Sequence, residues 1–481
     1  MASQEAARLL ATNAPALKME ELMAETCSVV LARFAAELEY AKIPPEVVQS
    51  VRFRLLDTVG VCLASVGMEY AKAIADMVRE QGGHPEATLF AHPERVPATW
   101  AVLHNAALAH GNDYDDTHSV ALVHPSGVII PTTLAVAERV GASGQDAVTA
   151  AVAGYEVGLR IGMAVPNRFH ARGFHATGVC GTFAAAVTAG RALGLDARGI
   201  ANAIGIAGSM AAGSMEFLSG GAWTKRMHPG WAAHAGTVAA LLAARRYTGP
   251  ATALEGRFGL FNAYAAPARP DLDRLTFGLG SEWEVLNTDF KPYPCGHISH
   301  PYMDCARSLR AKLKLTPEDI EAIELRVPGP AVSILCEPLA EKLKPANSYA
   351  ARFSLPYAVA VVLAQGFAGI DDFSDKRIRD PRILALAART TYQIDDTLPY
   401  PEHFPGWVRL RLRDGRQVEE RTDVSRGSRQ HPMTDAEFYE KFESNAARTL
   451  PRATLGAVWE TGLRFDTLGE VTQFTRLLSK S

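Results

Sequence analysis

The feature that most constrains the fold of this chain is a series of Ala- and Gly-rich segments between Met19 and Tyr247. Their apolar residues recur at spacings of three and four, which is the period of a helix, and Gly and Pro separate them. The pattern predicts helices at Ala24–Glu39, Pro45–Ser65, Ala98–His110, Thr132–Val140, Gln145–Ala164, Thr182–Leu193 and Gly230–Arg246. Several are apolar on more than one face, so we expect a helical assembly in which small residues let the helices approach closely.

The pattern changes near Trp283–Pro294, where mixed elements begin. We expect helices at 300–313, 350–365 and 380–392, a strand at 323–327, and a hairpin over 407–420 whose Asp414-Gly415 pair is typical of a type I′ turn. The expected fold is mainly α, with a large all-helical domain and a smaller α+β lid domain. We place the helical domain at 1–288, the lid domain at 289–430, and a helical tail at 431–481, with the site in the crevice between the domains.

Composition narrows the function classes. Of 481 residues, 48% are hydrophobic and the formal net charge is -3, so the chain lacks the excess of Lys and Arg that a nucleic-acid-binding surface needs. No apolar stretch is long enough to span a bilayer, and the first twenty residues show no signal peptide. The six cysteines are scattered without a CxxC pair, which is typical of reduced thiols. We expect a cytoplasmic protein that binds neither nucleic acid nor membrane.

The densest polar stretch is HGNDYDDTHSVALVHPS, residues 110–126, which lies between two apolar helical segments. It contains three aspartates, three histidines and three aliphatic hydroxyl groups. Charged groups are costly to bury unless they are paired or used, so this stretch is a candidate active site. A simpler interpretation makes Asp113 an N-cap and places Asp115 and Asp116 beside the helix dipole. That interpretation accounts for the aspartates but not for the histidines.

Three further polar clusters lie at boundaries marked by Gly or Pro: FHATG (174–178), WTKRMHPG (223–230) and KPYPCGHISH (291–300). Each also has an ordinary interpretation: His175 as a cap or core residue, Lys225 and Arg226 as a solvated pair, and His297 as part of a turn. Together, however, the clusters gather cations and imidazoles at helix N-termini, which attract carboxylates. They predict a small polycarboxylate substrate, with His or Asp residues moving protons beside it.

Other chemistries find little support in the sequence. A zinc site of Asp113, His118 and His124 is an alternative, but the HExxH and Cys/His spacings are absent, so we expect no metal. Neither GxSxG nor a P-loop occurs, and the Gly-rich runs lack the strand and helix of a dinucleotide site. We therefore do not expect a nucleotide-binding enzyme.

In their order and spacing, the four clusters resemble the signature of the MmgE/PrpD family, which includes 2-methylcitrate dehydratase, cis-aconitate decarboxylase and iminodisuccinate epimerase. The resemblance extends from about residue 24 to 463. It implies a helical domain to which the C-terminal helices at 431–481 return, with an α+β lid between the two parts. It also implies a homodimer and catalysis without a cofactor. A further family histidine falls on Gly296, with His297 adjacent, and the spacing from Thr117 to His124 differs by one residue from the decarboxylase pattern. The family's active-site positions correspond here to Asp113, Thr117, His124, His175, Lys225 and Lys291.

The resemblance implies a cofactor-independent lyase for a small di- or tricarboxylate, and our first interpretation is a hydro-lyase of the 2-methylcitrate dehydratase type. A decarboxylase and an epimerase are alternatives, since dehydration, decarboxylation and epimerisation all develop charge beside a carboxylate. A non-catalytic carboxylate-binding helical dimer is an alternative of another class. We expect catalysis by His124, His175, Asp113, Thr117 and Lys225, and substrate binding by Arg226, His228, Lys291 and His297.

Overall fold

The computed structural model describes residues 26–220, 222–400 and 403–480, and the expected lack of a signal peptide concerns residues outside them. Helices take up 57% of the chain and strands 8%. The mainly-α fold with a smaller α+β region is therefore confirmed. None of the helices in the described part of the chain is both long and apolar enough to cross a membrane.

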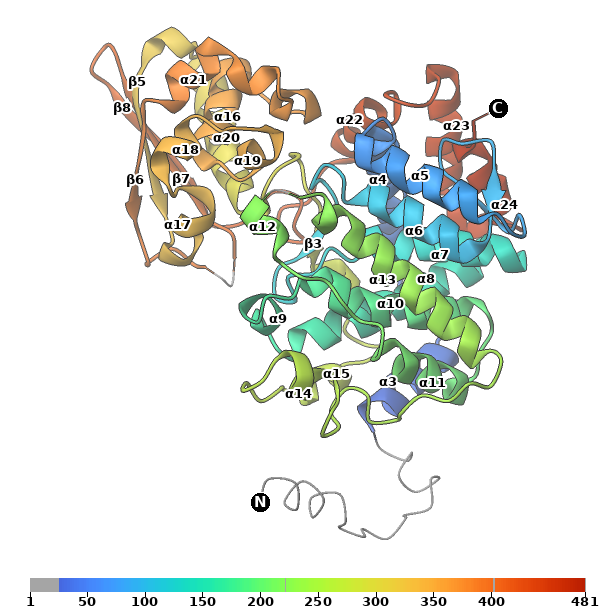
Figure 1. Cartoon of the computed structure of the whole chain (residues 1–481). Coiled ribbons are helices and arrows are strands. Elements are labelled where there is room, and N and C mark those ends of the chain that lie inside the picture. The colour runs from blue at the N-terminus through green and yellow to red at the C-terminus, as the bar shows by residue number, and fades with distance from the viewer. Residues whose placement is uncertain (1–25, 221, 401–402, 481) are drawn as a thin grey trace.

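The first part of the chain is an assembly of packed helices (Figure 1). α10 and α13 lie at its centre, because α10 packs against α7, α8 and α13, and α13 also packs against α6. Its elements are α3 (Cys27–Glu37), η1 (Tyr40–Lys42), α4 (Pro45–Ser65), α5 (Glu69–Gln81), β1 (Ala87–Thr88), β2 (Arg95–Val96), α6 (Ala98–Ala109), β3 (Thr117–His118), α7 (Ser126–Val140), α8 (Gly144–Met163), α9 (Arg168–Ala171), α10 (Ala176–Ala192), α11 (Ala197–Ala207), α12 (Phe217–Gly220), α13 (Thr224–Ala243), α14 (Leu260–Tyr264), α15 (Asp273–Thr276), η2 (Glu284–Asn287) and β4 (Thr288–Asp289).

Small residues bring α13 close to its neighbours. A Cβ atom added to Gly230 would lie 2.4 Å from the carbonyl oxygen of Leu103 on α6, and one added to Gly236 would lie 2.4 Å from that of Thr182 on α10. Any side chain at these positions would force the helices apart. The expected close approach of the helices is confirmed.

Three of these helices begin earlier than the sequence predicts. The pattern predicts starts at 132, 182 and 230, whereas α7, α10 and α13 begin at Ser126, Ala176 and Thr224. Pro131 and Pro229 explain two of the errors, because a proline removes a helical hydrogen bond and is typical of a helix boundary. Both helices nevertheless include their proline. The additional turns carry residues of the polar clusters.

The lid domain contains a four-stranded sheet of order β6-β5-β7-β8. β6 is parallel to β5, and the other pairs are antiparallel. α16 packs against β7, β8 and α20. The elements are η3 (His297–Ser299), α16 (His300–Leu313), η4 (Pro317–Asp319), β5 (Ile320–Val327), α17 (Gly329–Leu335), α18 (Leu339–Leu343), α19 (Ser348–Arg352), α20 (Leu355–Gln365), η5 (Ile370–Phe373), η6 (Arg377–Arg379), α21 (Pro381–Ala387), β6 (Thr390–Ile394), β7 (Gly406–Leu412) and β8 (Gln417–Thr422).

Three predictions for the lid domain are wrong in detail. The expected helix at 350–365 is divided into α19 and α20, because the side chain of Ser354 caps α20. The expected helix at 380–392 is divided into α21 and β6, whose Thr and Tyr residues favour a strand. The hairpin is not of type I′, since only Gly415 of the predicted pair has a positive φ, at +89°. It is a three-residue loop closed by a hydrogen bond from Leu412 N to Arg416 O.

The last helices return to the helical domain, where α22 and α23 lie beside α4 (Figure 1). They are α22 (Asp435–Ala446), α23 (Arg452–Leu463), η7 (Phe465–Thr467), α24 (Thr472–Thr475) and η8 (Arg476–Leu478). A buried ion pair between Lys441 Nζ and Asp57 Oδ1, 2.6 Å apart, joins α22 to α4. One large hydrophobic core draws on residues from 29–290 and 433–478, and a second on residues from 293–412. The domain boundaries at 288 and 430 stay predictions.

Candidate active site

The loop between α6 and α7 carries the first polar cluster. Within it, β3 pairs with β4, and this pairing brings the segment after β4 against the loop. Lys291 therefore lies beside Asp113, although 178 positions separate them. Asp113 has φ +52°, a left-handed conformation that is uncommon for residues other than Gly and is enriched for Asn and Asp. Such backbone outliers cluster at functional sites.

Asp113 binds two lysines. Its Oδ1 lies 3.2 Å from Lys225 Nζ and 3.2 Å from Lys291 Nζ, and its carbonyl oxygen accepts a further hydrogen bond from Lys291 at 3.0 Å. The side chains of Asp113, Lys225 and Lys291 are 7%, 11% and 1% exposed. Burial acts to raise the pKa of Asp113, but the two ammonium groups outweigh it and hold this pKa well below its usual value. The trio carries one more positive charge than negative charge.

Unlike Asp113, Asp116 binds no lysine among the described residues, and it holds the loop in place. It accepts hydrogen bonds from Arg54 Nη1 at 2.5 Å, from the backbone nitrogen of Ser126 at 3.1 Å and from the Ser126 hydroxyl. Arg54 also donates to the carbonyl oxygens of Val285 and Thr288. The side chains of Arg54 and Asp116 are both buried. This pair fastens the loop to α4, α7 and β4, so the Asp116 carboxylate is structural.

Five imidazoles gather next to Asp113 and its lysines. The ring of His110 lies 4.7 Å from that of His124 and 5.6 Å from that of His175, and the His175 ring lies 5.2 Å from that of His228 and 5.9 Å from that of His170. Burial and nearby positive charges lower the pKa of His110, His124 and His175 well below its usual value. They lower the pKa of His170 and His228 to about 4. The five rings are therefore neutral near pH 7 in the ligand-free protein.

Hydrogen bonds orient two of these rings. His124 Nδ1 lies 2.8 Å from the carbonyl oxygen of Asp116 and 3.0 Å from Thr117 Oγ1. Because a carbonyl oxygen can only accept, His124 Nδ1 carries the proton and Nε2 has the free lone pair. His110 Nδ1 lies 2.8 Å from Asp115 Oδ2. His110 Nε2 is buried and, among the described residues, has no hydrogen-bond partner.

Two of the predicted residues make their contacts outside this group. The Arg226 guanidinium lies over the Tyr70 ring at 5.2 Å from its centroid. His297 is buried in the lid domain, where its Nε2 lies 3.3 Å from Ser425 Oγ and its ring packs against Phe404. The remaining predicted residues lie in one of two groups. The lysine cluster consists of Asp113, Lys225 and Lys291. The imidazole cluster is the group of five rings described above, with Thr117 beside His124. Their roles in binding and catalysis stay predictions.

The structure also bears on the zinc alternative. In the described part of the chain, the sets of donor atoms close enough to hold a metal ion are His110, His124 and His175, and His110, Asp113 and Asp115. His118 belongs to neither set, because its Nε2 faces Glu284 at 3.3 Å and its Nδ1 accepts a hydrogen bond from the backbone of Ala121. The trio of Asp113, His118 and His124 is therefore wrong as a ligand set. That the enzyme needs no metal stays a prediction.

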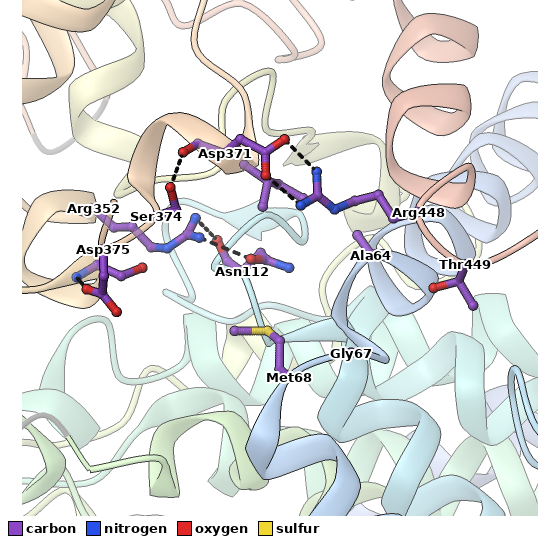
Figure 2. Close-up of a pocket in the computed structure, with 12 residues that line it drawn as sticks. Ala64, Gly67, Met68, Asn112, Arg352, Asp371, Ser374, Asp375, Arg448 and Thr449 are labelled. Atoms are coloured by element: carbon purple, nitrogen blue, oxygen red, sulfur yellow. Dashed lines mark hydrogen bonds and ion pairs between the residues drawn. The ribbon is translucent and has the colours of Figure 1, made fainter. Parts of the chain in front are cut away.

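A cavity of about 620 Å³ lies between the lid domain and the helical domain beside these clusters. Figure 2 shows Arg352 of α19 reaching Asn112, the residue before Asp113. In the same view, Asp371 pairs with Arg448, whose Nη2 lies 2.6 Å from Asp371 Oδ1. None of the predicted site residues lines this cavity. Asn112 lines the cavity and directly precedes Asp113 in the chain, so the cavity lies next to the clusters.

Family models match both parts of the chain. The model of the MmgE/PrpD N-terminal domain matches residues 29–273, and that of the MmgE/PrpD C-terminal domain matches residues 293–461. The chain belongs to the MmgE/PrpD family. The resemblance that the four polar clusters indicate is thereby confirmed.

The relatives of this MmgE/PrpD chain include several proteins named cis-aconitate decarboxylase. The Homo sapiens protein is 28% identical over 456 residues, which cover 92% of each chain. The Mus musculus protein is 28% identical over 446 residues (88% of this chain and 87% of the relative), and an Aspergillus terreus protein is 23% identical over 471 residues (93% and 95%). Decarboxylases are lyases, so the relatives support the expected enzyme class. They favour the decarboxylase alternative over our first interpretation, the dehydratase.

His110, His170 and Arg352 belong to the site or border it but have no assigned role in the sequence-based prediction. His110 belongs to the first polar cluster, and its dense polar surroundings are a signal that points to it. Arg352 comes from α19 in the lid domain. No polar cluster or motif marks the sequence around α19, so only the folded structure reveals that it lies against the loop.

Proposed function

We propose that this MmgE/PrpD protein is a cofactor-independent carboxy-lyase that decarboxylates cis-aconitate or a closely similar tricarboxylate. The observation that carries the proposal is a buried trio of two lysines and one aspartate beside five neutral imidazoles. The names of the relatives support decarboxylation over dehydration. This proposal therefore replaces the dehydratase as the preferred reaction.

The lysine cluster supports recognition of a polycarboxylate. Lys225 and Lys291 share a single carboxylate oxygen of Asp113, so one positive charge is left without a matching negative charge. Arg226 follows Lys225 directly and adds a second cation near the entrance of α13. In a buried setting, an unmatched cation strongly favours an anionic ligand over a neutral one.

The same cations suit the chemistry of decarboxylation. Loss of CO2 from cis-aconitate breaks the bond between the CH2 carbon and its carboxylate. The electron pair shifts across the adjacent double bond toward another carboxylate, and a proton is added at carbon to give itaconate. Stabilising the charge that develops on that carboxylate accelerates the reaction. We assign this role to Lys225 and Lys291, with Asp113 holding their ammonium groups in place.

The proton has to come from a group near the reacting carbon, and we assign it to His124 or His175. Both imidazoles are neutral in the ligand-free protein because their pKa values are lowered by burial and by the lysines. A substrate with three carboxylates brings negative charge, which raises the pKa of a neighbouring imidazole. The imidazole then binds a proton and can donate it to the carbanion. His124 Nε2 is a suitable atom, because Nδ1 is engaged by the loop.

NMR in deuterated water tests the reaction. The protein is mixed separately with cis-aconitate, 2-methylcitrate, citrate and iminodisuccinate. We expect itaconate from cis-aconitate, with one solvent deuteron at carbon and one CO2 released per turnover. Dehydration of 2-methylcitrate, or deuterium exchange into iminodisuccinate without loss of water or CO2, would point to the dehydratase or the epimerase instead. Binding without turnover would support the non-catalytic alternative.

Substitutions of Lys225 test the cation. Lys225→Ala should lower kcat/KM by an amount equivalent to about 2–4 kcal/mol of transition-state free energy if the partner carboxylate is buried and left unpaired. Lys225→Arg should lower kcat/KM less. Arg198→Ala on α11 is a matched control, because Arg198 is an exposed cation of the same domain. If Lys225→Ala has wild-type kinetics, Lys225 does not bind substrate.

We also propose that the protein is a homodimer. The exposed side of α13 supports this, since Trp223, Met227 and Trp231 recur every four residues and are 48%, 41% and 41% exposed. Such spacing puts the three side chains on one face of the helix. Light scattering should give twice the chain mass for the wild type, and Trp231→Glu should shift the mass toward the monomer. A wild-type monomer at micromolar concentration would contradict the proposal.

A further inference from the structure

The short helix α19 in the lid domain is fastened to the loop that carries Asp113. Arg352 Nη1 donates to the carbonyl oxygen of Asn112 at 2.8 Å, and Nη2 donates to Asn112 Oδ1 at 3.0 Å. Both residues are buried. Because Asn112 precedes Asp113, these contacts hold α19 next to the lysine cluster.

Tyr349, on the same helix, has a buried hydroxyl that forms no hydrogen bond with any described residue. Its ring packs against Phe353, with centroids 5.1 Å apart, and the Phe353 ring lies 5.4 Å from Lys225 Nζ. Burial raises the pKa of Tyr349, the charge of Asp113 raises it further, and Arg226 opposes them. The hydroxyl is therefore protonated and lies within the field of the cluster.

No acceptor of the described residues forms a hydrogen bond with this hydroxyl. Lys225 and Arg226 can only donate hydrogen bonds. Asp113 receives both lysines at Oδ1, and neither oxygen of its carboxylate accepts from Tyr349. A buried hydroxyl without a partner destabilises the folded protein. Where such a group persists in a native structure, a role in binding is a ready explanation.

We propose that the Tyr349 hydroxyl donates a hydrogen bond to a carboxylate of the bound polycarboxylate and is the lid domain's contribution to substrate recognition. This inference rests on the proposed function. A ligand carboxylate supplies the acceptor that the protein lacks at this place, and the cations beside it attract that carboxylate to the hydroxyl. The contact also links the lid domain to the occupied site.

Tyr349→Phe tests this directly, because it removes only the hydroxyl and keeps the ring against Phe353. We expect KM for cis-aconitate to rise about 10- to 100-fold, the usual loss when a hydrogen bond to a charged group is removed, with a smaller change in kcat. The Tm of the ligand-free variant should be equal to or above that of the wild type, since no protein hydrogen bond is lost. Tyr302→Phe is the matched control. Its hydroxyl donates to the carbonyl oxygen of Arg326 at 2.7 Å, so we expect a lower Tm and an unchanged KM.

An unchanged KM in Tyr349→Phe would overturn the inference. If the Tm were lowered as well, the hydroxyl would be structural. If the wild type turns over none of the tested carboxylates, the proposed function fails, and calorimetric affinities for citrate and cis-aconitate decide the inference separately. Weaker binding by Tyr349→Phe would then support it, and equal or undetectable binding by both proteins would overturn it.

Discussion

The substitution Asp113→Asn removes the negative charge at the centre of the lysine cluster while keeping the size of the side chain. Lys225 and Lys291 then lose the carboxylate oxygen that each approaches to 3.2 Å. Two buried ammonium groups are left next to each other without a counter-ion. We expect the variant to be strongly destabilised at neutral pH and to lose activity.

The magnitude follows from burial. Removing one partner of a buried ion pair costs about 3–5 kcal/mol, whereas an exposed pair contributes about 1 kcal/mol or less. With Lys291 1% exposed, the buried case applies. The pKa of Asp113 is lowered in the folded protein, so its contribution is present above the unfolded pKa of about 4 and is lost as the pH falls through the folded pKa. The free energies of unfolding of the wild type and of Asp113→Asn should therefore become equal at acidic pH.

Urea unfolding followed by tryptophan fluorescence measures this difference at a series of pH values. Glu420→Gln is the control for a surface pair, because Glu420 approaches Lys312 to 2.8 Å while the Lys312 side chain is 62% exposed. We expect the control to lose less than about 1 kcal/mol. The double variant Asp113→Asn with Lys291→Met should lose less than Asp113→Asn alone, since it buries one ammonium group fewer.

The reasoning would be refuted by a loss of less than about 1 kcal/mol in Asp113→Asn near pH 7. It would also be refuted by a loss that stays the same from neutral to acidic pH. Either result would mean that the two ammonium groups are solvated or paired in another way. The surplus positive charge invoked for substrate binding would then lose its basis.

Four further predictions concern metal dependence, two single substitutions and proton uptake on binding. Protein dialysed against a chelator should keep its full activity, and activity that returns only with added metal would contradict this. Burial raises the pKa of Asp289 to about 7, so its destabilising effect grows as the pH rises from about 4 through 7, and Asp289→Asn should raise Tm at pH 8 but not at pH 4. Gly236→Ala should cost about 1–3 kcal/mol by overpacking α13 against α10, measured by urea unfolding. Binding of a tricarboxylate should take up protons, seen as an enthalpy that varies with the ionisation enthalpy of the buffer.

The fold was predictable to the extent that it depends on local patterns. Spacings of three and four identify α3, α4, α6, α7, α8, α10 and α13 but not α5 or α11, and alternation identifies β5, β7 and β8. The first turns of α7 and α13 escape prediction because each precedes an internal proline, Pro131 or Pro229. Tertiary packing stabilises these turns despite the lost hydrogen bond, and local sequence carries no information about that packing.

The candidate site was predictable where its residues form dense polar clusters at helix boundaries. Asp113, Lys225 and Lys291 come from three such clusters, and the fold brings their charged groups together. The contribution of the lid domain was not predictable in this way. Arg352 and Asn112 are 240 positions apart, and a contact of that kind depends on how two domains meet rather than on any property of α19 alone.

The burial of the site accounts for its charge state before substrate binds. Low polarity and nearby lysines make every clustered imidazole neutral, while Asp113 keeps two ammonium groups charged. A neutral ligand would leave that surplus charge unmatched, whereas a polycarboxylate matches it and raises the pKa of the imidazoles beside it. Under the proposed function, a proton donor therefore forms only when the anionic substrate is present. The proposed selection of a polycarboxylate and the proposed supply of the proton would then follow from one arrangement of charges.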